Sequence, residues 1–153
     1  MKLYLMRHGE ALSPEKDPER GLTDNGKSKI KQVATHLQKA GVSFTRVIHS
    51  PKKRARETAE IMTAIISANV IPVEHNHIAP NDDPRLIIAE INDWDEDTLI
   101  ASHLPFVPNL MTLLTGQDTY LSAISFETGT VVCLERNDKN SWDVKWSTSP
   151  GEI

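Results

Sequence analysis

The sequence of 153 residues has almost no cysteine, no long hydrophobic run and no long run of basic residues. The single cysteine, Cys133, excludes a disulfide bond within the chain. The apolar opening at residues 2–6 is far shorter than the hydrophobic part of a signal peptide or a membrane-spanning helix. We therefore expect a soluble, cytoplasmic protein with no membrane partner.

The charge and the length of the chain limit its partners and its organisation. It carries 17 Lys and Arg against 21 Asp and Glu, a formal net charge of -4, and like charges are dispersed along it. Non-specific binding to nucleic acid needs a basic stripe, so no nucleic acid partner is expected. The length is enough for one sizeable core. We expect a single domain over residues 1–153 and a monomer.

Short strand-like runs alternate with longer helical patterns, and this order is typical of an α/β fold. Residues 130–135 and 142–146 flank a polar turn and predict an antiparallel hairpin, with Trp142, Val144 and Trp146 alternating against polar residues. We expect a three-layer α/β/α sandwich with a mostly parallel central sheet and this hairpin at its end. The other expected strands are residues 2–6, 46–49, 70–74 and 98–101.

Four helices are expected between these strands. Apolar residues at helical spacing predict the first, from a cap at Thr23 or Asp24 to Gly41. Ser50 is expected to cap the second helix, with Pro51 in its first position. The apolar stripes of these helices are expected to form the core rather than a ligand site. The two later helices are expected to begin at prolines, at Pro84 and after Pro105.

The segment GLTDNGKS, residues 21–28, has the spelling of a nucleotide-binding P-loop. A P-loop follows a buried strand, whereas residues 13–20 contain two prolines and five charged residues. No apolar strand ends in an aspartate that could hold a magnesium ion, because residues 98–101 lead into Ser102 and His103. We interpret the segment as a polar loop that enters a capped helix.

Residues suited to phosphate chemistry follow three of the expected strands. Arg7 and His8 follow the first, Arg54 lies shortly after the second, and His103 follows the strand at residues 98–101. Ligands of open α/β sheets bind beyond the carboxyl ends of the strands. Arginine matches phosphate oxygens, and histidine can be neutral and nucleophilic at neutral pH. The pattern predicts a phosphate site, where Gly9 lets the backbone approach the anion.

A metal hydrolase is the competing enzyme interpretation, with His8, Glu10, His49 and His103 as possible ligands. Such sites favour two histidines one helical turn apart, or several aspartates at strand ends. The sequence has neither pattern, so neither a metal nor a cofactor is expected. The remaining histidines are expected to be structural: His36, His49, His75 and His77.

Three motifs together resemble those of the histidine phosphatase superfamily, which includes the relatives of phosphoglycerate mutase. They are Arg7-His8-Gly9, Ser50-Pro51-x-x-Arg54-Ala55-x-x-Thr58 and Ser102-His103. Further stretches make the chain resemble the SixA-type phosphohistidine phosphatases: Met6-Arg7-His8-Gly9-Glu10-Ala11, Arg20-x-Leu22-Thr23-x-x-Gly26 and Ser102-His103-Leu104-Pro105. The similarity extends from the first strand to the final hairpin and is thin over residues 70–97. It implies a phosphoglycerate mutase-like fold.

The resemblance also implies roles for individual residues. His8 would attack phosphorus and become transiently phosphorylated, and water would then hydrolyse phospho-His8. Arg7, Arg54 and Arg20 would neutralise the phosphate oxygens, so that fixed cations take the place of a metal. His103 would donate a further hydrogen bond to the transferring group. In such proteins the Leu-Thr-x-x-Gly segment introduces the first helix, so the P-loop spelling is expected to be coincidental.

The region near the third strand bears on the substrate. Related mutases and sugar phosphatases carry a carboxylic acid there, because an alkoxide is a poor leaving group. Residues 75–83 contain no glutamate, so we expect phosphohistidine on a protein as the substrate. The expected partners are phosphate and a histidine phosphotransfer domain or a phosphotransferase-system carrier. Asp17 is the candidate general acid. A small-molecule phosphomonoesterase and a catalytically idle phosphate-binding domain are the alternatives.

Overall fold

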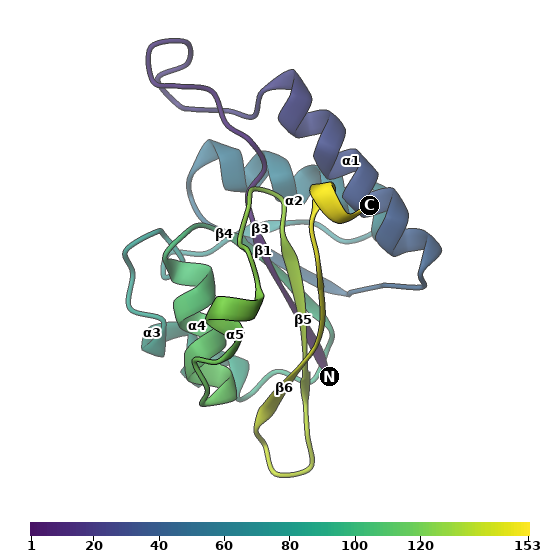
Figure 1. The fold of residues 1–153 in the computed structure, drawn as a ribbon, viewed down its shortest axis with the longest axis vertical. Helices are drawn as coiled ribbons and strands as arrows, with labels where there is room; N and C mark the ends of the chain where they lie inside the picture. The colour runs from purple at the N-terminus through teal and green to yellow at the C-terminus, as the bar shows by residue number, and fades with distance from the viewer.

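The computed structural model describes residues 1–153 and shows one sheet with helices on both sides (Figure 1). The strand order is β3-β2-β4-β1-β5-β6. Strands β3, β2, β4 and β1 are mutually parallel, whereas β5 and β6 are antiparallel to their neighbours at one edge. The strands are β1 (Lys2–Arg7), β2 (Arg46–His49), β3 (Val73–Glu74), β4 (Thr98–Ser102), β5 (Val131–Arg136) and β6 (Trp142–Thr148).

Helices cover both faces of this sheet. The helices are α1 (Asp24–Lys39), α2 (Lys53–Ile66), α3 (Arg85–Ile91), α4 (Phe106–Thr115) and α5 (Tyr120–Ala123), with a 3-10 turn at Pro150–Glu152. The apolar sides of α1 and α2 pack on one face, and those of α3 and α4 on the other. The expected three-layer sandwich is thus confirmed. The sequence pattern does not predict α5, because four residues are too few to show a helical period.

Strand β1 lies in the centre of the molecule and is buried on both faces. Leu3 and Leu5 join the apolar cluster under α3 and α4, whereas Tyr4 and Met6 join the cluster under α1 and α2. This alternation follows from the two-residue period of a strand. Because β1 is held from both sides, the residues at its carboxyl end have a rigid base. None of the helices is both long and apolar enough to span a membrane.

The GLTDNGKS segment enters α1 without a preceding strand, and its only sheet-like contact is the bridge between Ala11 and Leu22. Thr23 is the N-cap of α1, and its side chain accepts a hydrogen bond from Gly26 N at 2.8 Å. A Cβ atom at Gly26 would collide with the backbone of Glu10. The glycine therefore serves the packing of the helix start against the segment after β1.

The start of α2 differs from the prediction. The helix begins at Lys53, its N-cap is Lys52, and no side chain caps it. Ser50 Oγ accepts a hydrogen bond from Lys52 N at 3.2 Å, but it also bonds to the ring of His103. The expectation that Ser50 caps the helix is therefore wrong, because its hydroxyl belongs to the site described below.

The hairpin β5–β6 contains a register shift that splits an apparent apolar stripe. Cys133 pairs with Trp146 and Leu134 pairs with Val144, so one residue of β6 is left without a partner. Trp142 and Val144 consequently pack on the α4 side, whereas Trp146 packs on the opposite side of the sheet. Such an extra residue is a β-bulge, which reverses the direction of the side chains that follow it.

Candidate active site

The carboxyl ends of β1, β4 and β2 lie side by side. Strand β4 pairs in parallel with both of the other strands. Beyond these pairings, His8 N donates to Ser102 O at 2.9 Å and Ser50 N donates to Ala101 O at 3.1 Å. The segments that follow the three strands are therefore held against one another, and they bring His8, Ser50 and His103 together.

His8 is 7% exposed, and one tautomer suits its surroundings. Its Nδ1 lies 2.7 Å from the carbonyl oxygen of Gly9, which can only accept. Nδ1 therefore carries the hydrogen and Nε2 keeps its lone pair. Burial is the main cause that lowers the pKa of His8 to about 4, and three nearby guanidinium groups lower it as well: Arg54, Arg7 and Arg20. At neutral pH the ring is uncharged, which is the nucleophilic form.

Thr58 holds the peptide that orients the His8 ring. Gly9 N donates to Thr58 Oγ1 at 3.0 Å, and this hydroxyl donates to Arg54 O at 2.8 Å. A Cβ atom at position 9 would lie 2.8 Å from Cγ1 of Ile30. The structure thus gives another reason for glycine than the expected approach to an anion. The residue must be small because α1 packs against it, and its N–H is already used by Thr58.

His103 follows β4 and is buried. Its Nε2 forms a 2.5 Å hydrogen bond with Ser50 Oγ, while its Nδ1 is buried without a partner. The rings of His103 and His8 lie 5.1 Å apart between centroids. Burial, followed by the influence of His8 and nearby cations, lowers the pKa of His103 to about 3. If the Ser50 hydroxyl donates to Nε2, the neutral ring presents an Nδ1–H donor.

Three arginines surround these histidines without a carboxylate partner. Arg7 Nη1 donates to Phe126 O at 2.7 Å, and Arg20 Nε donates to Leu12 O at 3.0 Å. Arg7, Arg20 and Arg54 are absent from all seven ion pairs of the molecule. Burial lowers the pKa of Arg7 and Arg54, and the charge of Arg20 adds to the effect at Arg54. This uncompensated positive charge favours an anionic ligand.

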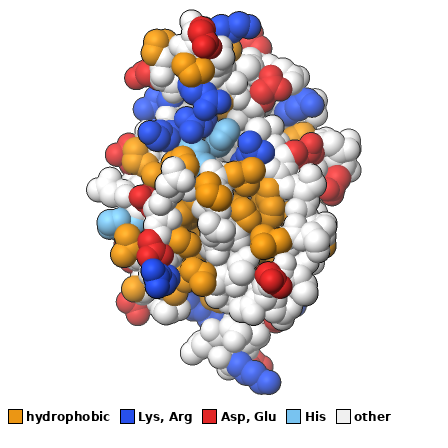
Figure 2. All heavy atoms as spheres, turned by 60° about the vertical axis from the view of Figure 1, so that its left-hand side comes forward, with side chains coloured by type: hydrophobic (Ala, Val, Ile, Leu, Met, Phe, Trp, Pro, Cys, Tyr) orange, Lys and Arg blue, Asp and Glu red, His pale blue; other side chains and the backbone are white.

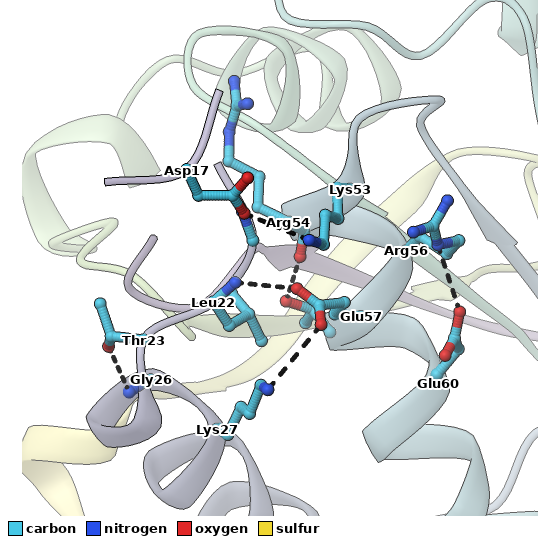
Figure 3. A network of polar contacts seen from close by, with 12 residues as sticks. Asp17, Leu22, Thr23, Gly26, Lys27, Lys53, Arg54, Arg56, Glu57 and Glu60 are labelled. Atoms are coloured by element: carbon cyan, nitrogen blue, oxygen red, sulfur yellow. Dashed lines mark hydrogen bonds and ion pairs between the residues drawn. The ribbon is translucent and has the colours of Figure 1, made fainter. Parts of the chain in front are cut away.

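Asp17, the candidate general acid, closes the loop that carries Arg20 (Figure 3). Its Oδ2 accepts from Gly21 N at 2.8 Å and lies 3.2 Å from Lys53 Nζ, and its Oδ1 accepts from Glu19 N at 3.1 Å. The hydrogen bond from Gly21 is the main cause that lowers the pKa of this carboxyl. These contacts favour the carboxylate form, which cannot donate a proton. They show that Asp17 closes the loop, and its role as the general acid stays a prediction.

Glu57 is a residue that the sequence motifs did not single out. From the second turn of α2 it accepts a hydrogen bond from Leu22 N at 2.8 Å, and its Oε2 lies 4.0 Å from Lys27 Nζ on α1 (Figure 3). It thereby fastens the loop and α1 to α2. No local pattern marks this role, since Glu57 and Leu22 are 35 residues apart in the sequence.

The residues considered as metal ligands have other partners. Glu10 accepts from Thr23 Oγ1 at 2.9 Å and from Asn25 Nδ2 at 3.2 Å, and His49 Nδ1 bonds to the Ser50 carbonyl at 2.8 Å. No group of three or more His, Cys, Asp or Glu side chains is arranged to hold a metal ion.

The fold and the site define a class of α/β protein, in which a neutral histidine at a strand end faces free arginines. The family model of the histidine phosphatase superfamily (branch 1) matches residues 3–76. The phosphohistidine phosphatase SixA of Escherichia coli (strain K12) is 30% identical over 159 aligned positions, covering 98% of this chain and 94% of SixA. The chain therefore belongs to the histidine phosphatase superfamily.

Solved structures agree with this assignment over the whole chain. The structure of the protein histidine phosphatase SixA complexed with tungstate matches with a TM-score of 0.87 at 27% identity. The match covers 99% of this chain and 98% of the SixA chain. A phosphoserine phosphatase mutant of Entamoeba histolytica in complex with phosphoserine has a TM-score of 0.74 at 14% identity, covering 99% of this chain and 98% of its own. The latter shows the fold alone. The resemblance to SixA that the motifs indicate is confirmed.

Proposed function

We propose that this protein is a phosphohistidine phosphatase, which removes the phosphoryl group from a histidine of another protein through phosphorylated His8. The observation that carries the proposal is the neutral, buried His8 among three arginines that have no carboxylate partner. Two comparisons with SixA support it. SixA is a phosphohistidine phosphatase, and SixA has been solved with tungstate, an oxyanion.

In the first step, Nε2 of His8 attacks the phosphorus, and the P–N bond to the substrate imidazole breaks. The Nδ1–H of His8 donates to Gly9 O and stabilises the positive charge that the ring acquires. The guanidinium groups balance the charge on the phosphoryl oxygens, as fixed cations do in other phosphoryl transfers. A proton from solvent water binds the other nitrogen of the substrate ring, so that neutral imidazole leaves.

In the second step, water attacks the phosphorus of phospho-His8, and the electron pair of the P–N bond returns to Nε2. Inorganic phosphate leaves, and the enzyme is restored. The lowered pKa of His8 assists this step, because a less basic imidazole is a better leaving group. In both steps the Nδ1–H of His103 donates to a phosphoryl oxygen.

The surroundings of the nucleophile favour phosphohistidine over a phosphate ester as the substrate. An ester releases an alkoxide, which needs a proton from a general acid. The groups that shift the pKa of His8 are arginines and one backbone carbonyl, with no carboxyl group among them. Imidazole leaves more readily than an alkoxide because it is far less basic.

The test is phosphate release, with EDTA present, from a phosphorylated histidine phosphotransfer domain and from p-nitrophenyl phosphate. We expect wild type to act on the phosphoprotein and His8→Asn to be at least about 1,000-fold slower. The matched control is His77→Asn, because His77 is an exposed histidine outside the site and its replacement should change nothing. Circular dichroism of the three proteins checks that each is folded.

The alternatives predict other outcomes. Undiminished release by His8→Asn, or complete loss of release on addition of EDTA, would show that the mechanism is wrong. Release from p-nitrophenyl phosphate alone indicates a small-molecule phosphomonoesterase. Release from neither substrate, with phosphate binding retained, indicates a phosphate-binding domain.

A further inference from the structure

The surface around the site is basic on one side and apolar on the other. Figure 2 shows Lys and Arg side chains gathered next to histidine, with a patch of apolar side chains directly below them. The basic side is a hollow between the loop that carries Arg20 and the start of α2. Its cations are Arg20, Lys52, Lys53, Arg54 and Arg56.

Three exposed leucines lie just before α4, on α4 and on α5, and we call them the leucine strip: Leu104, Leu113 and Leu121. Leu104 directly follows His103, so the strip begins at the edge of the site. Leu113 lies further along α4, roughly 10 Å beyond Phe106, its first residue, at the rise of an α-helix. Leu121 lies on α5, which packs against α4. The segment after α5 leads back to the site, where Phe126 O accepts from Arg7.

We propose that the leucine strip docks the protein that carries the phosphohistidine, an inference that rests on the proposed function. His8 is only 7% exposed, so a phosphohistidine side chain that reaches it brings the surface of its own protein against the rim of the site, which is formed by the basic hollow and the leucine strip. A typical protein interface covers roughly 800 Å² on each partner, about 30 Å across. One partner can therefore place its phosphohistidine at His8 and still cover Leu113 and Leu121.

The two sides of the rim define the chemistry of this partner. Its phosphohistidine lies next to an apolar surface that meets the leucine strip, with acidic side chains on the other side. The net charge of the chain is -4, so the positive charge at the rim is local and orients an acidic partner. Lys53 and Arg56 already have carboxylate partners. Arg20 and Arg54 serve the phosphoryl group, whereas Lys52 has no carboxylate partner and is the cation that meets the acidic side chains.

Ile71 provides a matched control, since it is an exposed apolar residue far from the site. It is 80% exposed, more than Leu113 at 47% and Leu121 at 44%. Ile71 precedes β3, whose first residue, Val73, pairs with Ile48 of β2, so Ile71 lies on the side of the strand starts, whereas His8 follows a strand end. A non-specific effect of surface lysine should therefore appear at Ile71 as well.

The experiment compares two substrates of the same bond type, a phosphorylated histidine phosphotransfer domain and free phosphohistidine. The variants are Leu113→Lys with Leu121→Lys, and Ile71→Lys as the control. We expect the double variant to raise KM for the phosphoprotein about 10-fold or more, with kcat unchanged. We expect kcat/KM for free phosphohistidine to stay within about two-fold of wild type. Ile71→Lys should leave both substrates unaffected, and thermal unfolding checks that all variants are folded.

The outcomes separate this inference from the proposed function. Equal changes for both substrates, or no change for either, overturn the docking assignment while wild-type hydrolysis of phosphohistidine leaves the proposed function standing. A wild-type kcat/KM that is higher for free phosphohistidine than for the phosphoprotein also overturns docking. Failure of wild type to hydrolyse either substrate overturns the proposed function, and the docking assignment with it.

Discussion

Two pairs of histidine rings have similar spacing in this molecule but opposite surroundings. The ring centroids of His8 and His103 are 5.1 Å apart, and those of His75 and His77 are 5.6 Å apart. The first pair is buried among cations. Burial, followed by these nearby positive charges, lowers the pKa of both rings. In the second pair, His75 Nε2 lies 3.0 Å from Glu90 Oε2, and His77 is exposed. A similar separation of two histidine rings therefore does not make a reactive pair. Burial among cations is what distinguishes His8 and His103.

Arginines show the same contrast. Arg46 Nη2 lies 2.7 Å from Glu96 Oε1, and its guanidinium lies 4.7 Å from the ring centroid of Trp94. Arg54 has neither kind of partner, and its Nε is buried without a hydrogen bond. The charge of Arg46 is thus balanced within the protein, whereas that of Arg54 is available to a ligand.

Within this comparison, the largest effect should follow from removing the charge of Arg54. We expect Arg54→Met to lower kcat/KM on the phosphoprotein by about 100- to 1,000-fold, because charge stabilisation in the transition state is lost. The free energy of unfolding, measured in urea, should not fall, because the variant removes a cation without a partner next to Arg20. Arg46→Met is the control and should retain its activity. A loss of stability large enough to account for the loss of activity would contradict this contrast.

A smaller effect should show which nitrogen of His103 faces the phosphoryl group. The amide of Asn reaches the position of Nδ1, whereas that of Gln reaches the position of Nε2. Because Ser50 occupies Nε2, we expect His103→Asn to keep a kcat about 10-fold above that of His103→Gln, with both below wild type. Steady-state kinetics measure the ratio, and the same replacements at His77 should leave kcat unchanged. A higher kcat for the Gln variant would assign the donor to Nε2 instead.

The smallest effect should be on stability in acid. Unfolded His8 takes up a proton near its ordinary pKa of about 6.5, but folded His8 does so only near a pKa of about 4. Between these two pH values His8 binds more proton in the unfolded chain than in the folded protein. The free energy of unfolding therefore decreases as the pH falls from about 6.5 toward about 4. From pH 7 to pH 5 we expect a loss of about 2 kcal/mol from His8.

Urea unfolding of wild type, His8→Asn and His77→Asn at both pH values measures this loss. His8→Asn should show a smaller pH dependence than wild type, and His77→Asn should resemble wild type. An equal pH dependence in all three proteins would remove His8 as its source.

Much of the architecture follows from local patterns in the sequence. Strands β1, β2 and β4 begin at the predicted residues, because each is a short apolar run with polar residues beside it. Thr23 caps α1 because its hydroxyl reaches Gly26 N within one turn. Arg7, His8 and His103 could be placed at one edge because they end or directly follow strands that turn out to be parallel neighbours.

Other features depend on pairings between distant residues, which no local pattern reports. Residues 70–74 predict a longer strand than β3, since only Val73 and Glu74 pair with β2. The side on which Trp146 packs depends on the bulge opposite Cys133 and Leu134. The hydroxyl of Ser50 is bound by His103, 53 residues further along, and is thereby lost to the helix cap.

The sequence alone is thus enough to establish the α/β order and to name the chemical groups that reach the carboxyl end of the sheet. It does not establish their state. The neutral charge of His8 comes from burial, the free charge of Arg54 from the lack of a nearby carboxylate, and the carboxylate form of Asp17 from hydrogen bonds that close its loop. Burial and hydrogen bonding depend on residues far apart in the chain. The protonation states and the hydrogen-bond partners of these groups therefore follow only from the tertiary structure.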